Sequence, residues 1–258
     1  MAADGPGAVA DGSLPVFLTN APPDGERALL DGEEGRHAAN VRRMRQGERL
    51  LLTDGAGELA ECVIETVRTG RDAEVGLLVQ KRWTRPSPSL RVTVVQALIK
   101  GERGELAVEL ATEAGADAIV PWRAARSIAR WDDGPRGTKA LQRWRRTAQA
   151  AAKQSRRAWV PEVREPVGID SLTRLVPAAS RALLLDGKAP DTIADVDLPN
   201  SGEILLVIGP EGGCDETERA RLSEVGAMSC RLGPTVLRAS TAATVALAAI
   251  GTRTSRWG

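Results

Sequence analysis

Two glycine-containing segments late in the chain have the composition of a ligand pocket. Residues 204–213 form an apolar run that ends in Gly209-Pro-Glu-Gly-Gly213, which predicts a buried strand with a sharp bend after it. Residues 232–242 read Leu-Gly-Pro-Thr-Val-Leu-Arg-Ala-Ser-Thr-Ala and begin with a second tight turn. Ligands of open α/β sheets bind at the carboxyl ends of strands, so the two turns could form one pocket lined by backbone groups. Alternatively, the turns only connect elements, as most Gly-Pro turns do.

Arg238 is the side chain in these segments best suited to catalysis. Its fixed charge could stabilise an anion that develops on a substrate, or hold a phosphate. Glu211 is a candidate base, although a carboxylate just ahead of a helix more often compensates the helix dipole. His37 is the single histidine, and it belongs to the other half of the chain. Ser-His-Asp catalysis and histidine-rich metal sites are therefore disfavoured, and neither GxGxxG nor a P-loop occurs at the turns.

The elements around the turns follow from capping signals and apolar runs. Asp215 and Glu218 have the spacing of a capping box, which predicts a helix over residues 216–225. Residues 228–232 and 182–185 are short strands, and Asp186 follows the second of these. Ser240 or Thr241 should cap a last helix that reaches Ile250.

The amino-terminal part of the chain predicts a small β-rich domain over residues 14–85. Strands are expected at 16–19, 49–53, 59–67 and 74–83, with a hairpin turn at Asp54-Gly55. A short helix over residues 37–45, closed by Gly47, should carry three arginines, Arg42, Arg43 and Arg45. These arginines either contact a nucleic acid or form a solvated face.

Pro86-Ser-Pro88 marks a boundary, and residues 86–258 have the alternating pattern of an α/β domain. Strands are expected at 92–98 and 118–120, and helices at 100–115 and 138–157. The first helix should turn Leu106, Leu110, Ala111 and Ala114 to one side. Residues 170–200 are expected to be irregular apart from the strand at 182–185.

Charge is balanced overall but not locally. The net charge of +1 gives no support for nucleic-acid binding, yet residues 123–164 hold twelve basic residues against three acidic ones. This excess favours RNA contacts, with a solvated helix face as the alternative. The tryptophans in this region are expected to be packing residues.

The three cysteines and the amino terminus bear on location. Cys62, Cys214 and Cys230 lack CxxC spacing and cannot all pair, which argues against a disulfide framework or a zinc site. Residues 1–13 are expected to be flexible and lack the features of a secretory signal, and no apolar stretch is long enough to span a bilayer. The sequence therefore predicts a cytoplasmic protein.

The motifs together resemble the SPOUT superfamily of S-adenosylmethionine-dependent RNA methyltransferases, and most closely its 16S ribosomal RNA uracil-N3 methyltransferase family. In that family a strand ends in Gly-Pro-Glu-Gly-Gly, and a later Leu-Gly-x-x-(Ile/Val)-Leu-Arg-x-x-Thr-Ala turn completes the cofactor pocket. Residues 209–213 and 232–242 match position for position. Many relatives have Glu where this chain has Ser240, so that carboxylate cannot have a general catalytic role.

The resemblance implies a carboxyl-terminal SPOUT α/β domain with a deep trefoil knot and a smaller amino-terminal PUA-like β-barrel domain that contacts RNA. It implies a homodimer, S-adenosyl-L-methionine as cofactor, no metal and no membrane, with the small ribosomal subunit and its 16S ribosomal RNA as substrate. Arg238 would be catalytic. The cofactor-binding residues would be Leu185, Ile208, Gly209, Pro210, Glu211, Gly212, Gly213, Leu232, Gly233, Val236, Leu237 and Thr241. The RNA-binding residues would be Arg42, Arg43, Arg45, Arg126, Gln154 and Arg156.

Three functions remain open at this point. The first is methylation of N3 of a uridine in 16S ribosomal RNA. The second is a SPOUT methyltransferase with another target, such as a tRNA ribose 2′-hydroxyl. The third is a non-catalytic RNA-binding protein that retains the fold. Ser240 in place of Glu is the one feature that favours it.

Overall fold

The structure, a computed structural model, describes residues 14–20 and 23–257. Residues 1–13, for which the sequence predicts flexibility, lie outside the described part. The described chain forms two compact units. One contains the residues up to Ser87 together with Ala152–Val160, and the other contains Pro88–Ala151 and the residues from Pro161 onward.

A five-stranded mixed sheet forms the first unit. Its strands are β1 (Val16–Leu18), β2 (Arg27–Leu30), β3 (Arg49–Thr53), β4 (Glu58–Arg68) and β5 (Glu74–Thr84). Their order is β1-β3-β4-β5-β2, and only β1 and β3 run parallel. Burial alternates along β4 and β5, so that one face packs into a core around Phe17, Leu50 and Ile64.

The hairpin predicted at Asp54-Gly55 is confirmed, since β3 and β4 pair as antiparallel neighbours across it. The Asp54 carboxylate closes the turn by accepting hydrogen bonds from the N–H groups of Ala56 and Glu58, at 2.7 and 3.1 Å. Strand β2 was not expected. It pairs with β5, and only its last residue is buried, so its own sequence carries little strand signal.

The helix expected over residues 37–45 was placed too late in the chain. α1 (Gly32–Arg36) begins five residues earlier and continues into a π-helical segment, η1 (His37–Val41). The helix ends because Arg43 adopts a left-handed conformation, with φ of 53°. The N–H of Met44 then donates to the carbonyl of Ala38, six positions earlier, at 3.0 Å. Arg42, Arg43 and Arg45 therefore lie beyond the helix.

A six-stranded parallel sheet forms the second unit. Its strands are β6 (Leu90–Ala97), β7 (Ala118–Trp122), β8 (Glu162–Val163), β9 (Arg181–Leu185), β10 (Gly202–Ile208) and β11 (Met228–Cys230). The order is β11-β9-β10-β6-β7-β8, so β10 lies between β9 and β6. Strands covered on both faces have continuous apolar sequences, which explains why the approximate positions of β6, β7, β9 and β10 could be predicted. The two-residue strand β8 was not expected.

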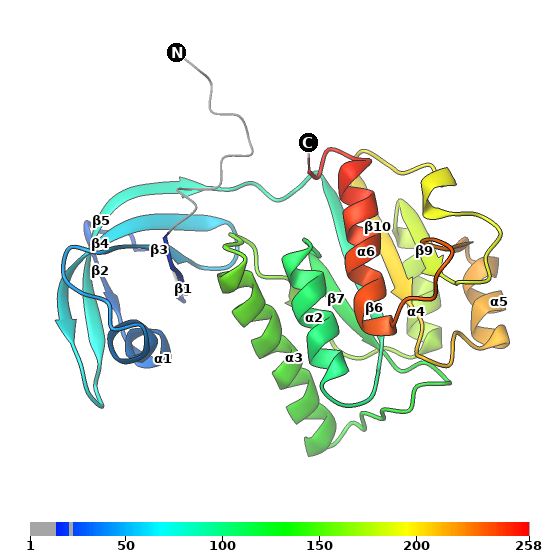
Figure 1. Cartoon of the computed structure of the whole chain (residues 1–258), viewed down its shortest axis with the longest axis horizontal. Helices are drawn as coiled ribbons and strands as arrows, with labels where there is room; N and C mark the ends of the chain where they lie inside the picture. Colours follow the sequence, from blue (N-terminus) through cyan, green and yellow to red (C-terminus); the bar gives the residue numbers. More distant parts are fainter. Residues whose placement is uncertain (1–13, 21–22, 258) are drawn as a thin grey trace, which may run out of the picture. The chain divides into compact units, whose positions relative to one another are not determined.

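Helices cover both faces of this sheet. They are α2 (Arg103–Glu113), α3 (Pro135–Gln154), α4 (Ile169–Leu175), α5 (Glu216–Glu224) and α6 (Ala239–Thr252), with short 3₁₀ turns η2 (Val176–Ala178) and η3 (Ile193–Asp195). Val94 and Leu206 pack in one core with residues of α2, α3 and α6, whereas Val95 and Val207 pack with residues of α4 and α5. Figure 1 shows α6 and α2 side by side on the first face. The second unit is thus a three-layer α/β domain.

Several predicted details in this unit are wrong. Helix α4 lies in the stretch expected to be irregular, because Leu172 anchors it in the core despite its polar neighbours. On α2 the buried face is centred on Ala107, Val108 and Ala111, and Leu106 is 40% exposed. The first residue before α6 is Arg238, not Ser240 or Thr241, and its side chain caps nothing. The trefoil knot stays a prediction.

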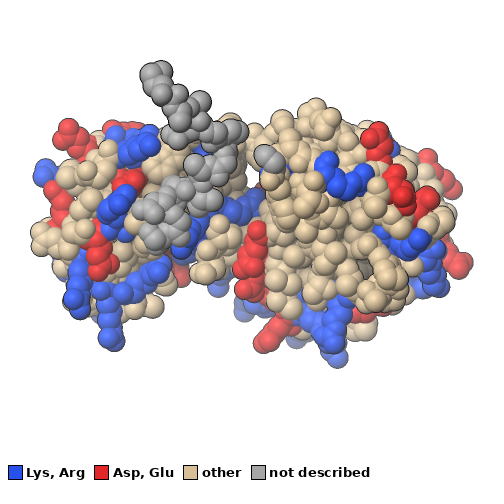
Figure 2. Space-filling view, turned by 45° about the horizontal axis from the view of Figure 1, so that its top comes forward, with Lys and Arg blue, Asp and Glu red and all other residues tan. Residues whose placement is uncertain are grey.

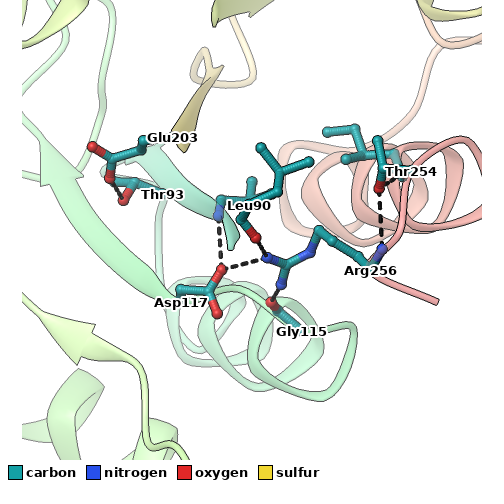
Figure 3. Close-up of polar contacts among 9 residues, drawn as sticks. Leu90, Thr93, Gly115, Asp117, Glu203, Thr254 and Arg256 are labelled. Atoms are coloured by element: carbon teal, nitrogen blue, oxygen red, sulfur yellow. Dashed lines mark hydrogen bonds and ion pairs between the residues drawn. The ribbon is translucent and has the colours of Figure 1, made fainter. Parts of the chain in front are cut away.

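Tryptophans and the end of the chain complete the core. Trp122 and Trp144 are buried, which confirms their predicted packing role. After α6 the chain is held by Arg256, whose guanidinium contacts the carboxylate of Asp117 at 2.7 Å and the carbonyl oxygens of Leu90 and Gly115 (Figure 3). The Arg256 and Asp117 side chains are only 8% and 6% exposed. This buried pair fixes the end of the chain to the start of β6 and to the turn before β7.

Candidate functional site

The strand ends that carry the two turns meet at one edge of the parallel sheet. Ile208 of β10 is in register with Leu185 of β9, and Leu185 is in register with Cys230 of β11. On the other side Ile208 is in register with Gln96 of β6. The segments that follow β9, β10 and β11 therefore leave the sheet at the same edge, and β9 alone separates the strands before the two turns. This arrangement agrees with a pocket shared by the turns.

The first turn, residues 209–213, is a tight bend that requires glycine. The N–H of Gly213 donates to the carbonyl of Pro210 at 2.9 Å, and Gly213 has φ of 74°. A β-carbon on Gly209 would lie 3.3 Å from the backbone nitrogen of Cys214, closer than side chains usually approach. Pro210 is buried, whereas Glu211, Gly212 and Gly213 are exposed. The bend thus presents its peptide groups outward.

A capping box fixes the end of this turn to α5, as the sequence predicts. The Asp215 carboxylate accepts from the N–H of Thr217 at 2.9 Å, and the Glu218 carboxylate accepts from the N–H of Asp215 at 3.4 Å. The hydrogen bond from Thr217 holds the pKa of Asp215 below its ordinary value. Caps of this kind stabilise the start of a helix.

Glu218 also binds a second loop. Its side chain is buried, 5% exposed, and its other carboxylate oxygen accepts from the N–H of Ala125 at 2.8 Å. Ala125 lies in the loop after β7, so one buried carboxylate joins that loop to the turn after β10. The sequence predicts only the capping-box role of Glu218, because the contact with Ala125 joins distant residues.

Arg126 reinforces the same connection. Its guanidinium lies 3.3 Å from the carbonyl oxygen of Gly212 and 3.6 Å from the carboxylate of Asp215, and half of its side chain is exposed. The sequence prediction placed Arg126 among the RNA-binding residues. In the structure it lies against the first turn, where it can position that turn and still present charge to solvent.

The segment after β9 is also held in place. The N–H of Asp186 donates to the carbonyl of Cys230 at 3.0 Å, and the Asp186 carboxylate pairs with Arg219 of α5 at 3.1 Å. Arg231 binds the carbonyls of Ala189 and Pro190 from the start of the second turn. The Asp186 carboxylate therefore lies beside the two turns and has a cationic partner.

The second turn leads directly into α6. The N–H groups of Thr241 and Ala242 both donate to the carbonyl of Arg238 at 3.0 Å, which fixes the Arg238 backbone as the helix start. The Arg238 side chain is exposed and has no ion pair or hydrogen bond with any residue that the structure describes. It is therefore available to a substrate. Ser240, in contrast, is 2% exposed, so it lies in the interior.

The predicted cofactor-binding residues fall into three groups by burial, of which Glu211, Gly212, Gly213 and Val236 are the exposed one. Leu185, Gly209, Leu232, Gly233, Leu237 and Thr241 are half-buried at the carboxyl edge, and Ile208 and Pro210 lie beneath them. Leu185, Leu232 and Leu237 pack on the core while keeping part of their surface accessible, as an apolar wall for a purine requires. Val236 is 93% exposed. Space is open where a β-carbon of Gly233 would project, so a ligand can approach that backbone closely.

The other predicted RNA-binding residues belong to the first unit. Arg42, Arg43 and Arg45 are exposed and have no acidic partner within the described chain. Gln154 ends α3 and Arg156 follows it with φ of 55°; both are exposed. The backbone of Ala158 and Val160 bonds to Gly57 and Gly55 at 3.0 and 2.9 Å, which attaches their segment to the β3–β4 hairpin.

The three cysteine thiols are buried. Burial raises the pKa of the Cys214 thiol to about 12 and those of Cys62 and Cys230 to about 11, so all three are protonated near neutral pH. Within residues 14–20 and 23–257, no group of three His, Cys, Asp or Glu side chains could hold a metal ion. No helix in that part of the chain is long and apolar enough to cross a membrane.

Comparisons with known proteins agree with this geometry. Residues 85–251 match the model of an RNA methyltransferase domain, and residues 30–78 match that of an RNA methyltransferase PUA domain. The chain is 49% identical to ribosomal RNA small subunit methyltransferase E of Mycobacterium bovis, over 93% of this chain and 92% of that protein.

Two solved structures are similar over nearly the whole chain. A methyltransferase of Legionella pneumophila in complex with S-adenosylmethionine has a TM-score of 0.84 at 29% identity, covering 93% of this chain and 98% of that one. A ribosomal RNA small subunit methyltransferase E of Neisseria gonorrhoeae bound to S-adenosylmethionine has a TM-score of 0.81 at 27% identity, with the same coverage.

Proposed function

The chain belongs to the ribosomal RNA small subunit methyltransferase E family, and from that premise we propose that it methylates N3 of a uridine in 16S ribosomal RNA. S-adenosylmethionine is the methyl donor in this proposal, as it is bound by two structurally similar proteins. The structural observation that carries the proposal is that the strands before two glycine-containing turns end at one sheet edge, with the exposed Arg238 in the second turn.

The residues present fit this cofactor. Leu185, Leu232 and Leu237 offer partly exposed apolar surface of the kind that packs against an adenine ring. The peptide groups of residues 209–213 and the open space at Gly233 can accommodate polar atoms at close range. When bound, S-adenosylmethionine supplies a sulfonium methyl group that is open to attack by a nucleophilic nitrogen.

Arg238 would act on the nucleic-acid substrate. Uracil N3 carries a weakly acidic proton, and its loss leaves negative charge on the ring that a fixed guanidinium stabilises. Because the Arg238 carbonyl accepts two hydrogen bonds while its exposed side chain has no ion pair with any described residue, the charge can be directed at the substrate without disturbing α6. Glu211 is exposed in the first turn and is the candidate proton acceptor.

The first unit would bind the RNA. Its similarity to an RNA methyltransferase PUA domain and its exposed Arg42, Arg43 and Arg45 support this role. Gln154 and Arg156 belong to the same unit and would contribute to the same contact. A homodimer and a cytoplasmic location are part of the proposal, on the basis of the family resemblance.

The test is a map of methylated nucleotides in 16S ribosomal RNA. RNA from a strain that lacks the gene should lose one base methyl group at N3 of a uridine, and complementation with the wild-type gene should restore it. Mass spectrometry of nuclease fragments distinguishes a base methyl from a ribose methyl. Loss of a ribose methyl, or of no methyl group in 16S ribosomal RNA, would overturn the proposal.

A further inference from the structure

Helix α3 carries a row of basic side chains along one exposed side. Within residues 135–154 there are six Lys or Arg residues and no acidic residue. Four of the six lie three or four positions apart and are exposed: Arg136, Lys139, Arg143 and Arg146. At 100° per residue they fall within about 80° of each other, so they form a single row along the helix. We call these four residues the α3 basic row.

The opposite side of the helix is apolar. Leu141, Trp144 and Ala148 are buried in the core of the second unit, which fixes the rotation of the helix about its axis. The α3 basic row is therefore directed away from the core by packing. The four side chains therefore stay on the exposed side of the helix whichever rotamers they adopt.

Most of this charge is not neutralised. Arg143 pairs with Glu105 at 3.0 Å, and the neighbouring Arg145, outside the row, pairs with Glu165 at 2.9 Å. Arg136, Lys139 and Arg146 have no ion pair with any residue in the described part of the chain. On the face that Figure 2 shows, basic and acidic side chains are interspersed.

Helix stability does not explain the row. Arg136 stands in the first turn, where the helix dipole favours acidic residues and disfavours cations. Like charges three and four positions apart also repel one another. An external anion would relieve both effects, which indicates that the row is arranged for a partner.

We propose that the α3 basic row binds the sugar-phosphate backbone of RNA, apart from the contacts of the first unit. Arg136 and Arg146 are about 15 Å apart along the helix axis at 1.5 Å per residue. A nucleic-acid duplex presents phosphates at roughly 3.4 Å per step on each strand, so several lie within that length. The row would recognise the charge and spacing of the phosphates and would not distinguish one nucleotide sequence from another. This inference rests on the proposed function for the identity of its ligand.

The test measures how RNA binding depends on salt, which requires no methyl transfer. A full-length variant with Arg136→Gln, Lys139→Gln and Arg146→Gln is compared with wild type for binding to an unmodified 16S ribosomal RNA transcript. Log K falls as log salt concentration rises, and each lost phosphate contact makes this negative slope shallower by about 0.7 to 0.9. The slope of the triple variant should therefore be shallower than that of wild type by about 2 to 3. Its affinity for S-adenosylmethionine should stay unchanged.

A matched control removes the same charge elsewhere. Arg91→Gln, Arg174→Gln and Arg221→Gln change exposed or half-exposed arginines at the start of β6 and on α4 and α5, across the sheet from α3. This control should keep the wild-type slope. A variant with Arg136→Lys and Arg146→Lys keeps the charges and should also keep the slope. Equal slopes for the triple variant and the control would overturn the inference, as would wild-type binding that does not depend on salt.

A second measurement uses the wild-type protein, so it does not depend on the folding of any variant. Acetylation of Lys139 by a small amine-reactive ester is followed by mass spectrometry with and without the RNA transcript. The RNA should slow acetylation of Lys139 several-fold. Unchanged reactivity of Lys139 at saturating RNA would contradict the inference. Because neither experiment measures methylation, a failure of the proposed function would leave these results separately interpretable.

Discussion

Glu218→Gln tests whether the buried carboxylate between two loops positions the cofactor turn. In the wild type one oxygen accepts from Ala125 at 2.8 Å and the other from Asp215 at 3.4 Å. The amide of glutamine is nearly isosteric, but it retains only one acceptor, so one of the two backbone N–H groups faces an NH₂ group. Leaving a buried partner unsatisfied costs about 1 to 3 kcal/mol, or roughly 5-fold to 150-fold in an equilibrium constant.

The assay separates a positioning role from a purely structural one. If the turn after β10 must be held to bind S-adenosylmethionine, calorimetry should show a dissociation constant raised about tenfold or more, in addition to a lower melting temperature. Glu216→Gln is the control, since Glu216 is an exposed acid in the same first turn of α5 and has no such contacts. A lower melting temperature in Glu218→Gln with an unchanged dissociation constant would refute the positioning role and leave Glu218 as a cap alone.

Three further predictions concern catalysis, stability and thiol chemistry. Arg238→Ala should fold and bind S-adenosylmethionine like wild type but lose most of its activity, on the order of 100-fold in kcat; an unchanged kcat in a methyl-transfer assay would remove Arg238 from the mechanism. Arg256→Ala breaks a buried pair with Asp117 and should lower the free energy of unfolding by about 3 to 5 kcal/mol, measured by urea titration, whereas Arg256→Lys should recover only part of this. A loss below about 1 kcal/mol would contradict the importance of that pair. With its pKa near 12, the Cys214 thiol should be about 10⁻⁴ ionised at pH 8 and resist iodoacetamide until urea unfolds the chain; rapid alkylation of the folded protein would show that burial does not suppress its ionisation.

Local signals in the sequence were enough to predict much of the second unit. The apolar runs of β6, β9 and β10 and the capping box at Asp215 each depend on residues within a few positions of one another. Such features can be predicted without knowing which distant residues pack against them. The family motifs at residues 209–213 and 232–242 indicated the sheet edge where the candidate pocket lies.

Features that depend on distant partners could not be predicted in the same way. Strand β2 exists because it pairs with β5, and the contact between Glu218 and Ala125 joins residues 93 positions apart. The helix ends where Arg43 is left-handed and the N–H of Met44 bonds to the carbonyl of Ala38, and the residue types there do not predict this end. Leu106 is exposed although its spacing suits a buried face, because packing against α6 selects the small residues of α2.

Titration of S-adenosylmethionine by calorimetry into wild type and two glycine variants tests the shared pocket most directly. Gly233→Val adds a side chain where no atom lies within 4 Å, so the protein should fold while the side chain occupies the space left for the cofactor. Gly168→Val, also free of neighbours within 4 Å but located before α4, is the matched control. Wild type and Gly168→Val should bind S-adenosylmethionine, and Gly233→Val should show no detectable binding. Absence of binding by wild type, or equal affinities for all three proteins, would contradict the shared pocket.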